Sequence, residues 1–558
     1  TLGGTLFPYT TLFRSGKVTD KTSFKSGVRH MTYSEETYKP SGGMSVGSFG
    51  QSEPQRLSLF INGRRFIGFG GNWGFGESNL NYREREYDIA VAYHADMNFT
   101  MIRNWVGQIG DKEFYEACDR HGIMVWQDFW LANPVDGPNP YYTEMFNANA
   151  CDYLKRIRNH PSIGIYVGRN EGNPPAGIDD YLRGLVFREH PGLYYISNSA
   201  MGVVSGGGPY RALSPKSYFQ SYGHDKFHSE RGMPNVMNYE SMLLTFGTDK
   251  IEPVNTSETP NPVYGLHDYT LGGGKGSSAQ AASSFNDMIE KAFGRPRDAK
   301  QFAEWAQWIN YDGYRAIFEG RSEHRRGMLL WMSHSAWPSM VWQTYDYYFD
   351  PNAAYFGCKK ASEPLHIQWN PLRDDIEVVN YHAFDRTGLT ATASLFNQDG
   401  TLQWTRETKL DIKEDQTVAC FPLEQPETLS DTYFIKLSLT DSDGKQLSDN
   451  FYWRGKEDGN YKSLLQLPKV SVCKNVTVKK TGKEWLIRAV LKNEARTPAL
   501  MLRLKVAGEK SGRMLLPVFY SDNYFSLLPG EVKEVDIRLY DADTYGEKPV
   551  LEVLGFNL

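Results

Sequence analysis

The run HPSIGIYVGRNEGNPP, residues 160–175, is the stretch of this sequence that decides the predicted fold. Its centre, Ile163 to Val167, is short, apolar and rich in β-branched residues, as expected of a parallel strand buried on both faces. The Gly and Pro residues that follow turn the chain into a loop. Asn170 and Glu171 are therefore predicted at the carboxyl-terminal end of the strand, where barrels of parallel strands place their functional side chains.

Apolar strands and helical stretches alternate on both sides of this run. The helix predicted at Asp111 to His121 has one apolar face and ends at Gly122. The connection before Phe227 is irregular, because only a few residues separate it from Tyr222; either that unit is degenerate or one strand is misplaced. Eight strands with intervening helices predict a (β/α)8 TIM barrel. The strands are expected at Phe66–Gly71, Asn98–Trp105, Ile123–Phe129, Ile163–Val167, Leu193–Ser197, Tyr218–Tyr222, Lys226–Ser229 and Met328–Trp331, and two long helices at Phe285–Phe293 and Asp298–Phe318.

After about Pro371 the pattern changes to two-residue alternation with frequent turns, which predicts two immunoglobulin-like β-sandwiches. The predicted fold class is thus α/β plus all-β, a TIM barrel followed by two sandwiches. The first sandwich is expected to contain strands Leu389–Asn397, Tyr433–Thr440 and Phe451–Arg454, and the second Trp485–Lys492, Met501–Val506 and Val532–Tyr540.

The start of the chain is expected to include non-native residues. Residues 5–15, TLFPYTTLFRS, look like the in-frame translation of a sequencing adapter, so the natural gene is expected to begin further upstream. Short β-rich pieces follow, and the turn Asn62-Gly63 is a strong hairpin signal. The predicted domains are an adapter-derived segment at 1–17, a remnant of an immunoglobulin-like domain at 18–62, the barrel at 63–370, and sandwiches at 371–458 and 459–558.

Composition limits the classes of partner. A chain of 558 residues has room for several domains, and its net charge of −5 without basic runs argues against nucleic acid as a partner. No apolar run approaches the length of a membrane span. The five cysteines lack CxxC spacing and no metal-ligand spacing is present, so neither a metal nor another cofactor is expected. The 13 Trp and 34 Tyr residues suit either stacking on sugars or the packing of β-rich cores.

A second carboxylate is needed if Glu171 acts in sugar chemistry, because one carboxyl protonates the leaving oxygen while another attacks or activates water. Glu230 is the best candidate, since it also ends a short strand and is followed by Gly and Pro. Glu240 and Glu258 are its rivals. The Asn-Glu dipeptide recurs at 493–494 inside an ordinary alternating strand, so the strand-end setting carries the prediction.

An ordered set of motifs resembles glycoside hydrolase family 2. The motifs are FGGNW at 69–73, MIRNW at 101–105, GIMVWQDFW at 122–130, RNE at 169–171 and SERGMP at 229–234. Leu330-Trp331, with SAWP at 335–338 and YDY at 345–347, also resembles that family, and SDNYFSLLPGE at 521–531 resembles the last domain of its exo-glucosaminidase and mannosidase branches. The similarity covers nearly the whole chain after residue 20.

The resemblance implies a retaining exo-β-glycosidase acting on an oligo- or polysaccharide. Glu171 would be the general acid/base and Glu230 the nucleophile, with Asn170 holding the 2-hydroxyl of the sugar. Retention implies carboxyl groups about 5 to 5.5 Å apart, and inversion roughly 6.5 to 9.5 Å. The further substrate-binding residues expected are Trp73, Arg103, Trp105, Asp128, Tyr222 and Trp331.

The sugar is left open between a mannosidase-like and a galactosidase-like preference. Glucosaminidases of the branch tend to have Ser-Asp where this chain has Asn170-Glu171, which disfavours that activity. The alternatives are an endo-acting relative with a long open cleft, or a catalytically silent carbohydrate-binding protein. The branch normally begins with a jelly-roll domain and a complete immunoglobulin-like domain, both expected to be missing here. Glycan-degrading relatives are often exported, which favours a periplasmic or secreted location.

Overall fold

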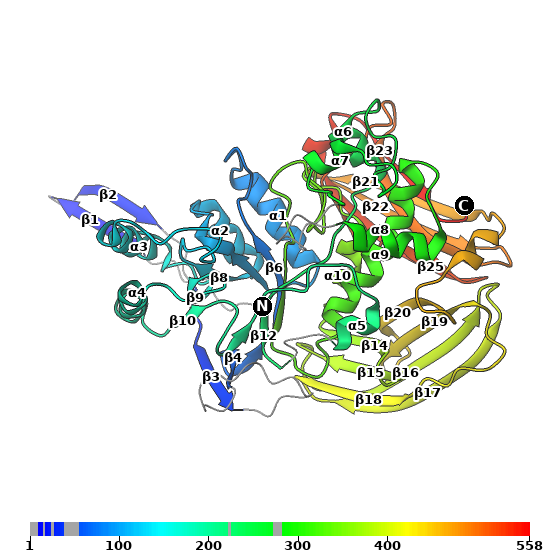
Figure 1. Cartoon of the computed structure of the whole chain (residues 1–558), viewed down its shortest axis with the longest axis horizontal. Coiled ribbons are helices and arrows are strands. Elements are labelled where there is room, and N and C mark those ends of the chain that lie inside the picture. Colours follow the sequence, from blue (N-terminus) through cyan, green and yellow to red (C-terminus); the bar gives the residue numbers. More distant parts are fainter. Residues whose placement is uncertain (1–8, 15–16, 24–26, 38–54, 221–224, 272–281) are drawn as a thin grey trace.

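A computed structural model describes residues 9–14, 17–23, 27–37, 55–220, 225–271 and 282–558 (Figure 1). Its central sheet contains eight parallel strands in the order β10-β9-β8-β7-β6-β13-β12-β11. This is the cyclic strand order of a TIM barrel, with β10 and β11 as the two edges, and it confirms the predicted fold class. The strands are β6 (Gly68–Trp73), β7 (Met101–Asn104), β8 (Met124–Asp128), β9 (Ile163–Arg169), β10 (Tyr194–Asn198), β11 (Val204–Ser205), β12 (Phe227–Arg231) and β13 (Gly327–Leu330).

Helices cover the sheet, and their ends follow local chemistry. The predicted helix α2 begins after Asp111 and ends at Gly122, whose φ of 72° is the left-handed conformation that glycine adopts without strain. The side chain of Asp298 accepts a hydrogen bond from the Gln301 amide and caps α9. The helices are α1 (Glu84–Asp96), α2 (Lys112–His121), α3 (Thr143–Ile157), α4 (Ala176–Glu189), α5 (Pro215–Gln220), α6 (Tyr239–Phe246), α7 (Pro262–Leu266), α8 (Ser283–Phe293), α9 (Ala299–Glu319) and α10 (Ala353–Ala361).

The prediction for the sixth strand is wrong. Tyr218 lies in α5, which packs against α9, and Tyr222 lies outside the described residues. The helix begins at Pro215, and proline is favoured at the first helical position because it has no N–H to leave unpaired. The sixth strand is instead the two-residue β11, which pairs with β12 and is too short to show any periodicity.

A three-stranded antiparallel sheet closes the amino-terminal end of the barrel. The Asn62-Gly63 turn joins β4 to β5 with φ values of 51° and 79°, which confirms the predicted hairpin. Leu57 and Leu59 are buried in one apolar cluster with barrel residues that include Trp126. The strands are β3 (Met31–Thr37), β4 (Gln55–Ile61) and β5 (Arg64–Phe66). The strands β1 (Tyr9–Arg14) and β2 (Lys17–Ser23) form a separate hairpin that projects beyond α3 in Figure 1.

The chain after the barrel forms two antiparallel sandwiches, and all six strands predicted there are present. In the first, β14 (Leu365–Asn370), β15 (Asp375–Asn380) and β18 (Gln416–Pro422) face β17 (Leu402–Ile412), β16 (Arg386–Asn397), β19 (Thr432–Thr440) and β20 (Gln446–Gly455). In the second, β21 (Val472–Thr481), β22 (Glu484–Asn493), β26 (Val532–Tyr540) and β24 (Val518–Tyr520) face β25 (Phe525–Leu527), β23 (Ala499–Gly508) and β27 (Pro549–Leu554). Because β14 pairs with β15, the first sandwich includes residues before the predicted boundary at 371.

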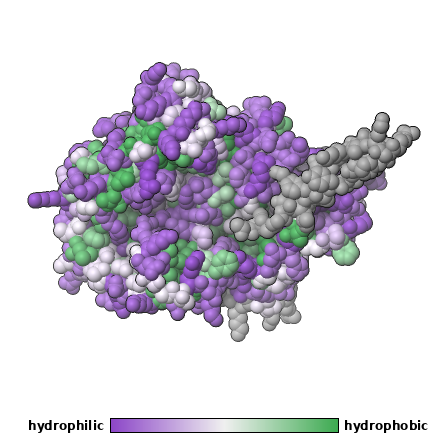
Figure 2. Space-filling model, turned by 180° about the vertical axis from the view of Figure 1, so that it is seen from behind, coloured by the Kyte–Doolittle hydropathy of each residue, from purple (hydrophilic) through white to green (hydrophobic). Residues whose placement is uncertain are grey.

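One face of the molecule is largely polar. Figure 2 shows that the face opposite Figure 1 is mainly hydrophilic, with hydrophobic residues in small separate groups. In the part of the chain that the structure describes, no helix combines the length and apolar character needed to cross a bilayer.

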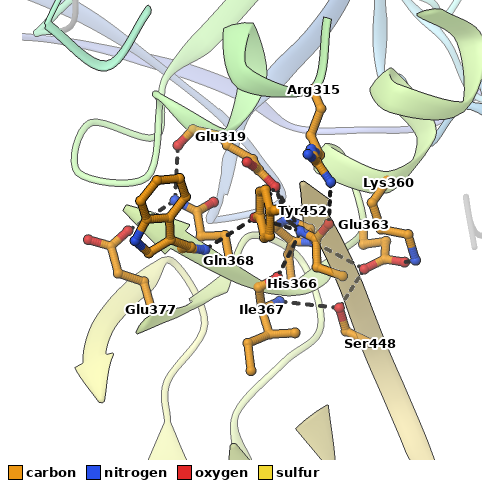
Figure 3. Close-up of polar contacts among 12 residues, drawn as sticks. Arg315, Glu319, Lys360, Glu363, His366, Ile367, Gln368, Glu377, Ser448 and Tyr452 are labelled. Atoms are coloured by element: carbon orange, nitrogen blue, oxygen red, sulfur yellow. Dashed lines mark hydrogen bonds and ion pairs between the residues drawn. The ribbon is translucent and has the colours of Figure 1, made fainter. Parts of the chain in front are cut away.

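A buried polar network joins the barrel to the first sandwich (Figure 3). The His366 ring on β14 is fully buried, with Nε2 at 3.0 Å from Glu319 Oε1 of α9 and Nδ1 at 3.0 Å from Glu363 Oε2. Ionised carboxylates only accept hydrogen bonds, so this arrangement favours the doubly protonated, cationic form of the His366 ring. Burial lowers the pKa of His366, and the two glutamates outweigh this effect and raise it above its ordinary value. Arg315 and Lys360 complete the charges around the network.

Replacing His366 with Gln tests this network. The change leaves two glutamates without their cation, so we expect the free energy of unfolding at pH 6 to fall by about 3 kcal/mol. Because the folded-state pKa of His366 is raised, its stabilisation is complete below the unfolded pKa of about 6.5 and is lost as pH rises through the folded pKa. Urea unfolding at several pH values measures the difference, with exposed His30→Gln as the control. An equal difference at pH 6 and at pH 10 would contradict the account.

Candidate active site

A buried arginine organises the polar side chains at the carboxyl-terminal ends of the barrel strands. Arg103 lies at the end of β7 and is 0% exposed. Its Nη1 donates to Glu230 Oε1 of β12 at 2.6 Å. Its Nη2 donates to Asp128 Oδ2 of β8 and to Asn170 Oδ1, each at 2.7 Å. One guanidinium therefore joins side chains from four strand ends.

Asp128 balances the charge of this guanidinium. It also accepts hydrogen bonds from the Trp126 indole at 2.8 Å and from the Val106 amide at 3.0 Å, which fixes both of its oxygens. Burial lowers the pKa of Arg103, but Asp128 and Glu230 outweigh it and raise the pKa. The guanidinium thus stays charged and holds one orientation, so it can present a fixed positive charge to Glu230.

Glu230 has a hydrogen-bond donor at each carboxyl oxygen. Arg103 binds Oε1, and the Tyr210 hydroxyl donates to Oε2 at 2.6 Å. Burial and the negative charge of Glu171 raise the pKa of Glu230 to about 7, although Arg103 and Tyr210 act in the opposite direction. Burial and the charge of Glu230 raise the pKa of Tyr210, so this phenol remains a protonated donor.

Glu171 lies beside this group and is partly exposed. Its backbone has a φ of 47°, a left-handed conformation that is uncommon for a residue other than glycine. Its amide donates to Ser199 Oγ at 3.0 Å, and that hydroxyl donates to Asn170 Oδ1 at 3.3 Å. A side chain added at Gly207, in the loop after β11, would begin 3.5 Å from Glu171 Oε1. The carboxyl therefore faces a glycine loop that leaves space beside it.

Four aromatic rings lie next to the carboxylates, and all four are partly exposed. The Trp331 ring, directly after β13, is 5.0 Å from the Trp105 ring, 5.9 Å from the Trp342 ring and 6.4 Å from the Tyr210 ring, measured between centroids. Tyr210 and Trp342 are 6.5 Å apart. We call these four residues the aromatic group. Flat apolar rings beside paired carboxylates suit a ligand with both an apolar face and hydroxyl groups.

Trp73, which was predicted for the site, is not in this arrangement. It is fully buried, its indole donates to His94, and its ring stacks on His334, so it belongs to the packing between strands and helices. Tyr222, also predicted for the site, lies outside the described residues. The tyrosine hydroxyl that contacts Glu230 in the described residues belongs to Tyr210.

The sequence reasoning missed Tyr210 and Trp342. Tyr210 follows three glycines and a proline in GGGPY, residues 206–210, and a Gly-rich loop directly after a strand was the available signal. Trp342 had no comparable signal, because it lies in the long connection between β13 and α10. Neither of the rival carboxylates lies with Arg103. Despite burial, Arg503 and Lys505 lower the pKa of Glu240 to about 2, and Glu258 is an exposed partner of Arg295.

Within the described ranges, His, Cys, Asp and Glu side chains form no group of three or more that is suited to a metal ion. The carboxylates and hydroxyls around Arg103 can take part in hydrogen bonding, proton transfer and nucleophilic attack.

Comparisons with known proteins show similarity over most of this chain. Residues 450–558 match the family model described as the exo-beta-D-glucosaminidase Ig-fold domain. A mannosylglycoprotein endo-beta-mannosidase of Lilium longiflorum is 27% identical, with 89% of this chain and 63% of that protein covered. An exo-beta-D-glucosaminidase of Streptomyces avermitilis is 28% identical, with coverage of 89% and 60%. This chain spans about three fifths of the length of these curated relatives.

Solved structures show the same fold. The exo-chitosanase of Amycolatopsis orientalis superposes with a TM-score of 0.85 at 23% identity, over 99% of this chain and 68% of that one. The beta-D-mannosidase of Dictyoglomus thermophilum gives a TM-score of 0.76 at 20% identity, over 98% and 65%.

The fold is a TIM barrel with accessory β-sandwiches, and carboxylates lie at the ends of its strands. The sequence relatives include exo-beta-D-glucosaminidases and a mannosidase, and they confirm the resemblance of this chain to the exo-glucosaminidase and mannosidase branch of glycoside hydrolase family 2.

Removing the Tyr210 hydroxyl tests the electrostatics of Glu230 without any assay of activity. In Tyr210→Phe the carboxylate loses one of its two donors, so we expect the pKa of Glu230 to rise above about 7. Carbon-13 NMR titration of labelled glutamate side chains measures this pKa. Tyr433→Phe, which removes a hydroxyl in the first sandwich, is the control and should leave the titration unchanged. An unchanged or lowered pKa in Tyr210→Phe would show that the contact does not stabilise the ionised form.

Proposed function

We propose that this chain is the catalytic part of a retaining exo-β-glycosidase, which releases terminal β-linked sugars from glycans. The observation that carries the proposal is the environment of Glu230, where Arg103 and Tyr210 hold the two carboxyl oxygens in fixed positions. A carboxylate oriented by two donors is prepared for attack on an anomeric carbon. Glu171, just after the end of β9, supplies the second carboxyl that glycoside hydrolysis requires.

In the proposed first step, the proton resides on Glu171, which removes the negative charge that helps to raise the pKa of Glu230. Ionised Glu230 attacks the anomeric carbon while Glu171 gives its proton to the leaving oxygen. The glycosidic C–O bond breaks and an ester bond forms between the sugar and Glu230. In the second step, Glu171 takes a proton from water, whose oxygen attacks the anomeric carbon and releases Glu230 as carboxylate. The two steps together consume one water and retain the β configuration.

The remaining residues have supporting roles in this proposal. The amide oxygen of Asn170 accepts hydrogen bonds from Arg103 and Ser199, which fixes the side chain. Its amide nitrogen would donate to a hydroxyl of the sugar, for which we propose the 2-hydroxyl. Trp105 and Trp331 would stack on the sugar ring. Asp128 contacts Arg103 and is fully buried, so its role is to position the guanidinium and not to bind the sugar directly.

β-Mannosides are the first substrates to test, because mannosidases occur among both the sequence relatives and the solved structures. A second candidate function, cleavage within a glycan, is supported by the name of the Lilium relative, an endo-beta-mannosidase of mannosylglycoproteins. β-Galactosides and β-glucosaminides complete the panel.

Glutamine substitutions separate the two proposed carboxylate roles. Glu230→Gln removes the nucleophile, so we expect turnover of 2,4-dinitrophenyl β-glycosides to fall by about 10⁴-fold or more. Glu171→Gln removes the acid/base, so we expect large losses with p-nitrophenyl glycosides but little loss of the first step with the better dinitrophenyl leaving group. Added azide should rescue Glu171→Gln and yield the β-glycosyl azide, because an anionic nucleophile needs no general base. Chromogenic assays and product NMR measure these outcomes.

Glu240→Gln is the control, because this carboxylate pairs with Arg503 away from the site. Equal losses in all three variants would indicate misfolding. Full activity in Glu230→Gln would refute the assignment of the nucleophile. Release of single sugars from a β-linked oligosaccharide supports the exo-acting function, and release of oligosaccharides supports the endo-acting one.

A further inference from the structure

We propose that Trp342 is a sugar-binding platform at the mouth of the site, held in place by a strained backbone at Val341-Trp342. The inference rests on the proposed function, and it adds a specificity-determining residue and a ligand chemistry. The ligand is a pyranoside that offers a flat apolar face and a hydroxyl acceptor. Trp342 lies in the connection between β13 and α10, downstream of the strand-end motifs.

The position of Trp342 supports this role. Its ring is 5.9 Å from Trp331 and 6.5 Å from Tyr210, and the Tyr210 hydroxyl donates to Glu230. One aromatic ring therefore separates Trp342 from the proposed nucleophile. Trp342 is partly exposed, so part of its face is available to a ligand.

The indole nitrogen of Trp342 is buried, and no residue that the structure describes accepts its hydrogen bond. A buried N–H without an acceptor is unfavourable, and native proteins retain few of them. The indole N–H points outward in the plane of the ring, whereas stacking uses the ring face. In an oligosaccharide, one pyranose could lie on the exposed face while a hydroxyl of a neighbouring unit accepts from the N–H at the ring edge.

The backbone beneath the ring is strained. Val341 has a φ of 74° and Trp342 a φ of 58°, so two successive residues other than glycine adopt left-handed conformations. The branched side chain of Val341 makes this conformation especially unfavourable. Such strain persists only where surrounding contacts impose it, and it is concentrated at ligand clamps and active sites.

Hydrogen bonds on both sides impose this conformation. The Met340 amide donates to the His267 carbonyl at 2.8 Å, and the Val341 amide donates to the Asn235 carbonyl at 3.2 Å. The Thr344 amide donates to the Ser333 carbonyl at 3.2 Å. These hydrogen bonds fix the segment to His267, to the loop after β12 and to its own start. They hold the strained backbone and thereby keep the Trp342 ring in one position.

Core packing is the simplest competing role for Trp342, since its ring also contacts the main apolar core. A residue that served only packing would gain nothing from a strained backbone and an unpaired indole N–H. Trp337, in the same connection, provides a matched comparison. Its ring is 36% exposed and stacks on His267 outside the aromatic group.

Isothermal titration calorimetry with methyl β-D-mannoside and β-1,4-mannobiose tests the platform in the inactive Glu230→Gln background. We expect Trp342→Ala to raise Kd by about tenfold, the effect of losing one stacking contact and one hydrogen bond. Trp342→Phe keeps the stacking surface and loses the N–H, so it should raise Kd by about threefold. Trp337→Ala is the control and should leave Kd unchanged.

Val341→Gly tests the role of the strain. Val341 is 4% exposed, so Val341→Gly and Val341→Ala both lose a buried side chain, but only glycine adopts a φ of 74° without penalty. We therefore expect a higher melting temperature for Val341→Gly than for Val341→Ala. The relaxed segment no longer fixes the ring, so Kd should increase more in Val341→Gly. A melting temperature no higher in Val341→Gly than in Val341→Ala, with an unchanged Kd, would overturn the strain argument.

The outcomes distinguish this inference from the proposed function. If the wild-type chain hydrolyses a glycoside and Trp342→Ala leaves Kd unchanged, the platform is refuted and the proposed enzymatic function stands. If binding depends on Trp342 but no glycoside is hydrolysed, the enzymatic function is refuted and the platform stands. Failure of the Glu230→Gln protein to bind either mannoside would also overturn the platform for this sugar class.

Discussion

The arrangement of the site depends on the contacts of the Arg103 guanidinium. A fully buried cation is tolerated only where its charge and its N–H groups are satisfied, and here Asp128, Asn170 and Glu230 satisfy them. These partners come from three other strand ends, so the contacts form only when the strands of the barrel are in register. The same contacts fix the orientation of Glu230. The geometry of the site therefore depends on correct assembly of the barrel.

Strand alternation explains which side chains reach the site. In the β6–β7 ladder Asn72 pairs with Arg103 and both point inward, where Asn72 donates to the Ser229 and Leu330 carbonyls. Their neighbours Trp73 and Asn104 point outward to the helix layer. Arg103 was predicted for the site from its motif and its strand, and the structure places it against Glu230. The prediction that Trp73 lines the pocket was wrong, because Trp73 directly follows the inward-pointing Asn72 and its side chain therefore points outward.

The strand-end pattern correctly predicted the barrel and the positions of Glu171 and Glu230 at the ends of its strands. It could not locate Tyr210, because the strand before it has only two residues and carries no periodicity. It could not locate Trp342 either, because long-range hydrogen bonds set the conformation of that segment. Local sequence therefore predicted residues on regular strands, and tertiary contacts determined those on loops.

The two sandwiches contact different parts of the barrel. Arg503 of the second sandwich binds Asp350, at the end of the connection that contains Trp342, and Tyr524 donates to Asn238 after β12. The first sandwich is joined to α9 through Glu319 and His366 (Figure 3). The second sandwich therefore holds loops of the barrel, and the first holds one of its helices.

The most direct test of the central claim is covalent trapping of the nucleophile. A 2,4-dinitrophenyl 2-deoxy-2-fluoro-β-glycoside of the preferred sugar forms the glycosyl ester quickly, while the fluorine slows its hydrolysis. Peptide mass spectrometry then locates the sugar. The account predicts a labelled peptide with the ester on Glu230. A label on another residue, or turnover to the inverted α-sugar without any label, would contradict it.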